Sequence, residues 1–145
     1  MKNLLLASII IFAAAANVYS QKKLIAFSSD ATKNDKQQIF IMDEEGDNVK
    51  QVAFLDLDCY NPKFAPNSTK IVFCATNVIS DYLYTIDLAD TSTFRFPMFL
   101  DGGIDPVFSE DGTMLMYRSE KEEENNVYIM DMKTGESFVI SDGSL

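Results

Sequence analysis

Three aspartates recur at a constant spacing and are the residues best placed for chemistry in this sequence. Asp43, Asp87 and Asp131 lie 44 residues apart, and each ends a short apolar segment. A ring of such carboxylates would suit Ca²⁺ or a basic partner. An aspartate at a strand end also accepts backbone hydrogen bonds within the turn that follows it. Because the residue is the same in every copy, we favour this turn role over a binding site.

Composition excludes several other kinds of site. The 145 residues include 22 acidic and 12 basic side chains, two Cys and no His. Without histidine there is no Ser-His-Asp or Cys-His system and no zinc site that uses imidazole, and two cysteines cannot make a four-thiolate site. The formal net charge of −10 opposes binding to a phosphate backbone, so we expect no nucleic-acid partner. We also expect no cofactor.

The N-terminal segment predicts export. A positive charge precedes an apolar run over residues 4–16, and Val18 and Ser20 fit the −3 and −1 positions of a signal-peptidase site. We predict a signal peptide over residues 1–20, cut after Ser20, and a mature chain in the periplasm or outside the cell. The run is shorter than the roughly 20 residues of a membrane span. No second long apolar run follows, so we expect no transmembrane segment in the mature chain.

Cys59 and Cys74 have two interpretations. Exported proteins fold in oxidising compartments, where these two thiols would be able to form a disulfide. Each cysteine also fits as a small, half-buried residue of a strand. The sequence leaves both interpretations open.

An internal repeat defines the elements that carry these residues. The three segments that end in the recurring aspartates match position by position, and so do three segments upstream of them and two segments that contain a proline. They are Ile39–Asp43, Leu83–Asp87 and Val127–Asp131; Ile25–Ser29, Ile71–Ala75 and Leu115–Ser119; and Asn61–Thr69 and Asp105–Thr113. The segments are rich in β-branched and aromatic residues and are bounded by Asp, Asn, Gly and Pro, so they predict strands joined by turns.

Further strands and turns complete each copy. Val49–Val52 and Ser137–Ile140 are expected as fourth strands, and Asp111-Gly112 predicts a hairpin in which glycine takes a positive φ. Four short strands in a period of about 44 residues are the signature of a β-propeller blade. We therefore predict an all-β fold of four-stranded antiparallel blades. The expected blade units are residues 22–58, 59–102 and 103–145, and the first lacks its leading strand.

The repeat resembles that of the TolB family of periplasmic propeller proteins. Asp105–Gly112, with the sequence DPVFSEDG, and Val127–Asp131 carry the resemblance best. It implies a TolB-like, non-catalytic role in cell-envelope organisation or transport. The same repeat also occurs in the propellers of prolyl-oligopeptidase-like peptidases. The resemblance further implies a ring of six blades and a preceding α/β domain, and no such domain is visible here.

About three blades cannot close a ring, because closed propellers have about four to eight. Three explanations follow: a fragment of a larger envelope propeller protein, an open arc, or a protomer that completes the ring with a copy of itself or a partner. A homodimer would supply six blades, and two-fold dimers are the commonest assemblies.

Acidic residues in linkers and loops are the candidate partner-binding positions. In propeller topology the linkers between blades share a face with the loops between second and third strands, where binding usually resides. The candidates are Asp56, Asp58, Asp101, Asp105, Glu122, Glu123 and Glu124. Because a run of like charge is also typical of a solvated surface, and the opposite face is acidic too, charge alone does not single out this face. We expect a non-catalytic module that binds a protein or peptide; the alternative is the propeller part of a hydrolase or peptidase.

Overall fold

The computed structural model describes residues 23–32, 35–66, 69–90, 92–95, 102–119 and 126–141. The regular secondary-structure elements that these residues form are all strands, joined by turns. In chain order the strands are β1 (Leu24–Ser29), β2 (Gln38–Asp43), β3 (Lys50–Gln51), β4 (Asp58–Phe64), β5 (Lys70–Thr76), β6 (Asp81–Asp87), β7 (Ser92–Arg95), β8 (Gly103–Phe108), β9 (Met114–Ser119), β10 (Asn126–Asp131) and β11 (Ser137–Ser141). In this part of the chain no helix has the length and hydropathy of a membrane span. The predicted signal peptide lies outside the described residues.

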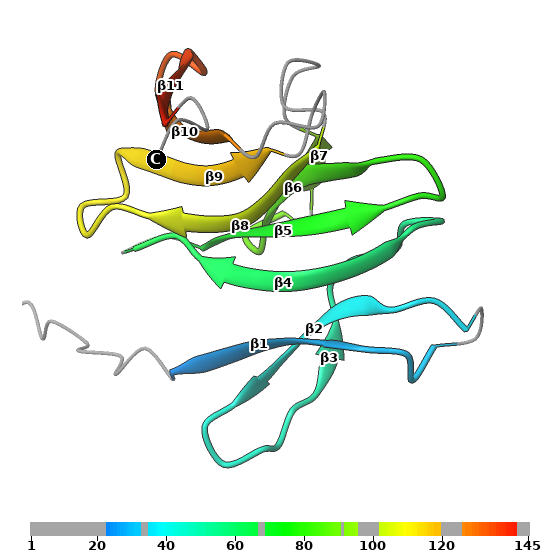
Figure 1. Ribbon diagram of the computed structural model, residues 1–145. Helices are drawn as coiled ribbons and strands as arrows, with labels where there is room; N and C mark the ends of the chain where they lie inside the picture. The colour runs from blue at the N-terminus through cyan, green and yellow to red at the C-terminus, as the bar shows by residue number, and fades with distance from the viewer. Residues whose placement is uncertain are drawn as a thin grey trace, which may run out of the picture.

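The strands form three antiparallel sheets in which neighbours along the chain pair with each other. The first sheet has the order β1-β2-β3, the middle sheet β4-β5-β6-β7 and the last sheet β8-β9-β10-β11. The sheets are stacked one after another, with the first at the bottom of Figure 1 and the last at the top. The predicted fold class is confirmed: the strands within each sheet are antiparallel, and the sheets do not close into a propeller ring. The repeat does not predict β7.

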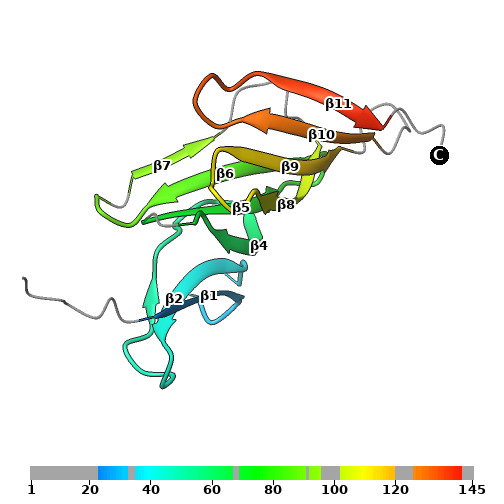
Figure 2. The ribbon, with the colours of Figure 1, turned by 90° about the vertical axis from the view of Figure 1, so that its left-hand side faces the viewer.

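Two hydrophobic cores hold the stack together, one at each junction between sheets. The first core joins the first and middle sheets, and its buried residues include Ile39, Phe73 and Ile86. The second core joins the middle and last sheets and includes Leu83 and Tyr117. The middle sheet is therefore covered on both faces, and the turned view in Figure 2 shows it between its two neighbours.

The repeat places an aromatic pair at the same point of each sheet. Phe27 and Phe40 are directly opposite each other on β1 and β2, and their ring centroids lie 5.7 Å apart. The equivalent pairs are Phe73 with Tyr84, at 5.7 Å, and Tyr117 with Tyr128, at 5.4 Å. Stacked aromatic pairs stabilise a sheet by more than the burial of their apolar area contributes. This stabilisation explains why each copy of the repeat has aromatic residues at these positions.

The recurring aspartates have the turn role that we favoured. Asp43 Oδ1 accepts a hydrogen bond from the amide of Asp47 at 2.7 Å. Asp87 Oδ1 accepts one from the amide of Ala89 at 3.0 Å. Asp131 Oδ1 accepts bonds from the amides of Lys133, at 2.7 Å, and Thr134, at 2.9 Å. Each carboxylate thus stabilises the turn that follows its strand.

The hairpin between β8 and β9 turns at the expected dipeptide. Gly112 has a φ of +72°, a conformation that favours glycine. Asp111 Oδ1 accepts hydrogen bonds from the Ser109 hydroxyl at 2.6 Å and from the Thr113 amide at 3.0 Å. These bonds hold the pKa of Asp111 at about 2, well below its ordinary value.

The two cysteines are free thiols on opposite faces of the middle sheet. Cys59 belongs to the core with Phe73, whereas Cys74 follows Phe73 on β5 and belongs to the other core. Successive residues of a strand point to opposite faces, so the sheet itself separates the two sulfur atoms. This geometry agrees with the strand interpretation and not with the disulfide. Burial raises the pKa of both thiols to about 12.

Candidate binding face between the first two sheets

The segment that joins β3 to β4, residues 52–57, is called the linker below. Its first two residues remain beside β2, where the amides of Val52 and Ala53 donate to the carbonyl of Ile39 at 2.9 and 3.3 Å. Both side chains are buried in the first core. The next residue, Phe54, turns outward and is 75% exposed. Burial of a large apolar side chain is energetically favourable. The exposed ring of Phe54 therefore makes the linker a candidate contact surface.

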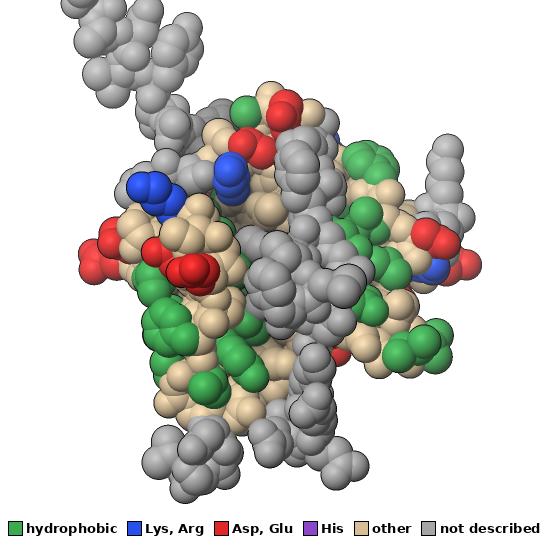
Figure 3. Space-filling model, turned by 90° about the horizontal axis from the view of Figure 1, so that it is seen from above, with side chains coloured by type: hydrophobic (Ala, Val, Ile, Leu, Met, Phe, Trp, Pro, Cys, Tyr) green, Lys and Arg blue, Asp and Glu red, His purple; other side chains and the backbone are tan. Residues whose placement is uncertain are grey.

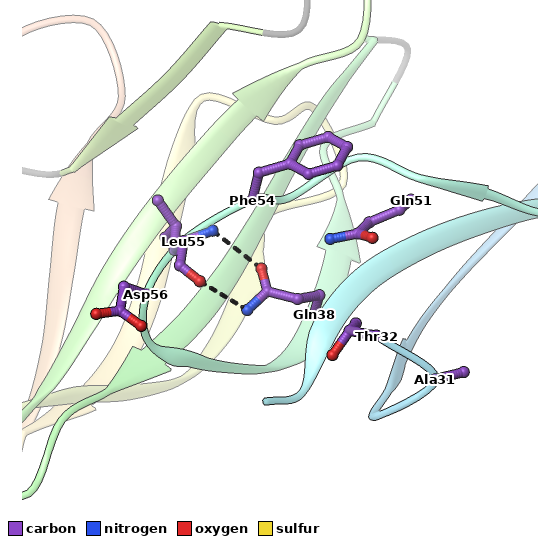
Figure 4. Close-up of a pocket in the computed structure, with 7 residues that line it drawn as sticks. All are labelled: Ala31, Thr32, Gln38, Gln51, Phe54, Leu55 and Asp56. Atoms are coloured by element: carbon purple, nitrogen blue, oxygen red, sulfur yellow. Dashed lines mark hydrogen bonds between the residues drawn. The ribbon is translucent and has the colours of Figure 1, made fainter. Parts of the chain in front are cut away.

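A buried glutamine fixes the path of the linker. Gln38, on β2, is 1% exposed. Its Nε2 donates to the carbonyls of Leu55, at 2.9 Å, and Leu57, at 2.8 Å, and its Oε1 accepts from the amide of Leu55 at 3.0 Å. Figure 4 shows two of these bonds, with Gln38 reaching across to Leu55. One side chain therefore satisfies three backbone groups of a segment that belongs to no sheet.

The β1–β2 loop is fastened to the same linker. Lys36 Nζ contacts Asp56 Oδ1 at 2.5 Å and donates to the Asp56 carbonyl at 2.8 Å. The hydrogen bond with Lys36 lowers the pKa of the Asp56 carboxyl, so Asp56 is ionised at neutral pH. The amide of Gln37 donates to Asp58 Oδ1 at 2.9 Å. The loop and the linker thus form one connected surface.

Two cavities lie on this surface, one on each side of Asp56. The larger has a volume of about 750 Å³ and is lined by Ala31, Thr32, Gln38, Gln51, Phe54, Leu55 and Asp56, the residues drawn in Figure 4. The smaller has a volume of about 300 Å³ and is lined by Lys36, Asp56, Leu57, Asp58, Thr76, Asn77 and Val78. Cavities of this size fit side chains or a small ligand. We call this surface the binding face.

Exposed apolar side chains flank both cavities. Phe54 lines the larger cavity and Val78, in the β5–β6 loop, lines the smaller one; Val78 and its neighbour Ile79 are almost fully exposed. Asn77 Oδ1 accepts the amides of Ile79 and Ser80 at 2.8 and 2.9 Å. These bonds shape a tight turn that presents both apolar side chains to solvent.

The structure brings together only part of the predicted set of acidic residues. Asp56 and Asp58 line the same cavity, together with residues of the β5–β6 loop. The linker and this loop therefore do share a face in the middle repeat, as propeller topology implies. Asp101 and Glu122, Glu123 and Glu124 lie outside the described residues. Within the described ranges no cluster of three or more Cys, Asp or Glu side chains is placed to hold a metal ion.

Asp105 has a different environment from Asp56 and Asp58. It lies on β8 with a φ of +53°, beside an irregularity in the β8–β9 register, and Asn61 has the same φ at the equivalent point of β4. Asp105 Oδ1 accepts from Asn61 Nδ2, and its Oδ2 contacts Arg118, both at 3.3 Å. Asp105 therefore links the first strands of two sheets and lines neither cavity.

Sequence reasoning missed the residues that shape the binding face. Lys36, Gln38 and Phe54 lie outside the repeated segments identified above, and the contacts of Lys36 and Gln38 join parts of the chain about 20 residues apart. One signal was available for Gln38: the equivalent positions of the later repeats hold Tyr82 and Asn126. Residues with a structural role tend to be the same in every copy of a repeat. A position at which the copies differ is therefore a candidate for a site.

Comparison with known proteins identifies the fold of this chain but no sequence family. No protein-family model and no curated protein matches this chain. TolB from Acinetobacter baumannii superposes with a TM-score of 0.66 at 20% identity, over 83% of this chain and 32% of that one. A putative TolB from Agrobacterium tumefaciens gives a TM-score of 0.73 at 17% identity, over 82% and 42%. This chain has a TolB-like β-propeller fold.

The TolB-like fold is shared with enzymes. Dipeptidyl peptidase 4 from Porphyromonas gingivalis matches with a TM-score of 0.68 at 15% identity, over 86% of this chain and 18% of that one. The chain spans less than half the length of each of these three proteins. At these identities the likeness defines architecture, and function has to be argued from the site.

Proposed function

We propose that this chain is an exported, non-catalytic binding module that holds a segment of a protein or peptide at the binding face. The observation that carries the proposal is the pair of cavities that share Asp56 as a common wall. Two adjacent cavities suit successive side chains of an extended peptide. The exposed ring of Phe54 and the side chain of Val78 supply apolar contact on either side.

The chemistry of the face indicates the kind of segment that it takes. Interfaces gain most from aromatic and aliphatic anchors that become fully buried, and Phe54, Val78 and Ile79 are all free to be covered in this way. Asp56 is already paired with Lys36, so the carboxylate of Asp58 and the net charge of −10 favour a basic partner through long-range attraction. The preferred segment therefore combines apolar side chains with Lys or Arg.

The binding face is also held in shape before a partner arrives. The three hydrogen bonds of Gln38 and the contacts of Lys36 with Asp56 fix the linker and the β1–β2 loop. Preorganisation of this kind reduces the entropy lost on binding. It supports a role in recognition, because loops on a rigid β scaffold are a common site of binding.

Export of the chain is part of the same proposal. The N-terminal sequence has the pattern of a cleaved signal peptide, and the TolB resemblance favours the periplasm. The chain, with its net charge of −10, would there meet basic segments of envelope proteins.

The competing function is that of the propeller part of a hydrolase, and the match to a dipeptidyl peptidase is the observation in its favour. Two features support the non-catalytic proposal instead. The sequence contains no histidine to act as a general base beside a nucleophile. Both cysteine thiols are buried, with pKa values of about 12, so neither is suited to nucleophilic attack.

Selection of a random peptide library on the immobilised mature chain tests the proposal. We expect enrichment of sequences with an aromatic or aliphatic residue next to Lys or Arg. Phe54→Ala should weaken the Kd of a selected peptide roughly 30-fold, equivalent to a loss of about 2 kcal/mol for a central aromatic anchor. Val139→Ala, which removes an exposed apolar side chain of β11 far from either cavity, is the matched control and should leave the Kd unchanged.

Two results would contradict the proposal. Equal affinity of the selected peptides for the Phe54→Ala variant and for the wild type would show that the binding face is not the site. Failure to enrich any peptide, combined with hydrolysis of a panel of peptide or glycan substrates by the mature chain, would favour the enzyme.

A further inference from the structure

Each junction between sheets pairs two different kinds of face. The leading face of a sheet is defined here as the one that packs on the preceding sheet, and the trailing face as the one that packs on the following sheet. The leading faces of the middle and last sheets present Phe73 and Tyr117, which occupy equivalent repeat positions. The trailing faces of the first and middle sheets present Ile39 and Leu83, which are also equivalent. The same pairing therefore occurs twice within the chain.

The leading face of the first sheet carries the same pattern but has no partner among the described residues. Ile25 is 41% exposed, whereas its repeat equivalents Ile71 and Leu115 are 0% exposed. Phe27, equivalent to the buried Phe73, is only partly buried. Phe40, directly opposite Phe27, is only 8% exposed, so the uncovered part of this face is the part around Ile25.

The trailing face of the last sheet is the other uncovered surface. Met116 is 40% exposed, whereas its equivalent Val72 is 1% exposed. Val107, directly opposite Met116 on the neighbouring strand, is 49% exposed. Figure 3 views the molecule from the side of this sheet, and hydrophobic side chains are exposed there in separate groups.

We propose that a second copy of this chain covers both uncovered faces at once, with each trailing face packed on the leading face of the other copy. The two faces are the same kinds that already pair twice within one chain, so each copy carries both halves of the required interface. Two copies give six blades, within the range of about four to eight found in closed propellers, whereas three copies would give nine. A two-fold dimer closes such a ring and leaves no sheet face bare.

The charged pair that Arg118 and Asp105 form on the last sheet does not oppose this assembly. Arg118 occupies the position equivalent to Cys74 and is already paired with Asp105 on the same sheet, at 3.3 Å. Its charge is therefore compensated before the faces meet, and the apolar residues around it are left to drive association.

The test uses light scattering coupled to size exclusion on the mature chain. We expect a mass twice that of one chain for the wild type. Met116→Lys and Ile25→Glu each place a charge on one of the two faces, so each variant alone should run as a monomer. Val139→Lys, at an exposed position of β11 opposite Tyr128 and so on the other face of the last sheet from Met116, is the matched control and should remain a dimer. Circular dichroism checks that each variant keeps its β spectrum.

Mixing the two variants distinguishes this arrangement from any other dimer. In a mixed ring one junction joins Met116→Lys to Ile25→Glu, with opposite charges, and the other junction is wild type on both sides. We therefore expect the equimolar mixture to recover the dimer mass. A monomeric wild type, an assembly larger than a dimer, or a mixture that stays monomeric would overturn the proposal. None of these outcomes depends on peptide binding, so the proposed function is tested separately.

Discussion

Replacement of Gln38 by leucine should loosen the linker while leaving the sheets paired. Gln38 is buried and makes three hydrogen bonds to the linker, with the amide and carbonyl of Leu55 and the carbonyl of Leu57, besides a weak one that its Oε1 accepts from Cys59 Sγ at 3.8 Å. Leucine keeps most of the volume and removes all three bonds. At a net contribution of about 1 kcal/mol per hydrogen bond, Gln38→Leu should lower the free energy of unfolding by about 3 kcal/mol.

The matched control is the other glutamine that bonds to the linker. Gln51 is half-buried and donates a single hydrogen bond, from Nε2 to the carbonyl of Ala53 at 2.7 Å. Gln51→Leu should therefore cost about 1 kcal/mol or less. Urea unfolding followed by circular dichroism gives both values from the shift of the midpoint at constant slope.

Hydrogen exchange supplies the local readout for the same pair of variants. In the wild type the Leu55 amide is bonded to Gln38 Oε1 at 3.0 Å, and Gln38→Leu should remove its protection while the amides of β5 remain protected. Equal unfolding free energies for the two variants, or an unchanged exchange rate at Leu55, would refute the claim that Gln38 holds the linker in place.

Two further predictions concern titration and thiol reactivity. Hydrogen bonds from Ser109 and Thr113 hold the pKa of Asp111 at about 2 against an ordinary value of 3.8. The stability that Asp111 contributes is therefore fully present above about pH 4 and is lost as the pH falls towards 2, so the urea midpoint should fall over this interval less in Asp111→Asn than in the wild type. Burial raises the pKa of Cys59 and Cys74 to about 12, so Ellman's reagent at pH 8 should detect no thiol in the native chain and two in urea; none in urea would reveal a disulfide.

The repeat made the strands predictable. A residue that recurs at intervals of 44 to 46 positions must satisfy the same local environment in each copy, and this constraint applies to the aromatic positions 27, 73 and 117 and to the aspartates that end the third strand of each unit. The positions predicted for β2, β6 and β10 were correct for this reason. Strand β7 was missed because its four residues, Ser92–Arg95, have no alternation long enough to be recognised.

The binding face was not predictable in the same way. Its cavities form where the β1–β2 loop, the linker and the β5–β6 loop meet, and these segments are not repeated in sequence. Asp56 and Asp58 were named because of their charge, but charge does not indicate that Lys36 neutralises one of them or that Phe54 stands beside it. Such contacts depend on how one sheet is placed on the next, which a single sequence does not encode in any local pattern.

The proposed peptide site and the proposed dimer would be coupled through the first sheet. This sheet has three strands, its third strand is only two residues long, and one of its faces is uncovered in a single chain. It also supplies Gln38 and, next to it, the β1–β2 loop, on which the larger cavity depends. A second copy that covers Ile25 and Phe27 would stabilise this sheet, since a partner that binds only the folded form shifts the equilibrium towards it. By linkage, a peptide that requires the ordered binding face would in turn strengthen the dimer.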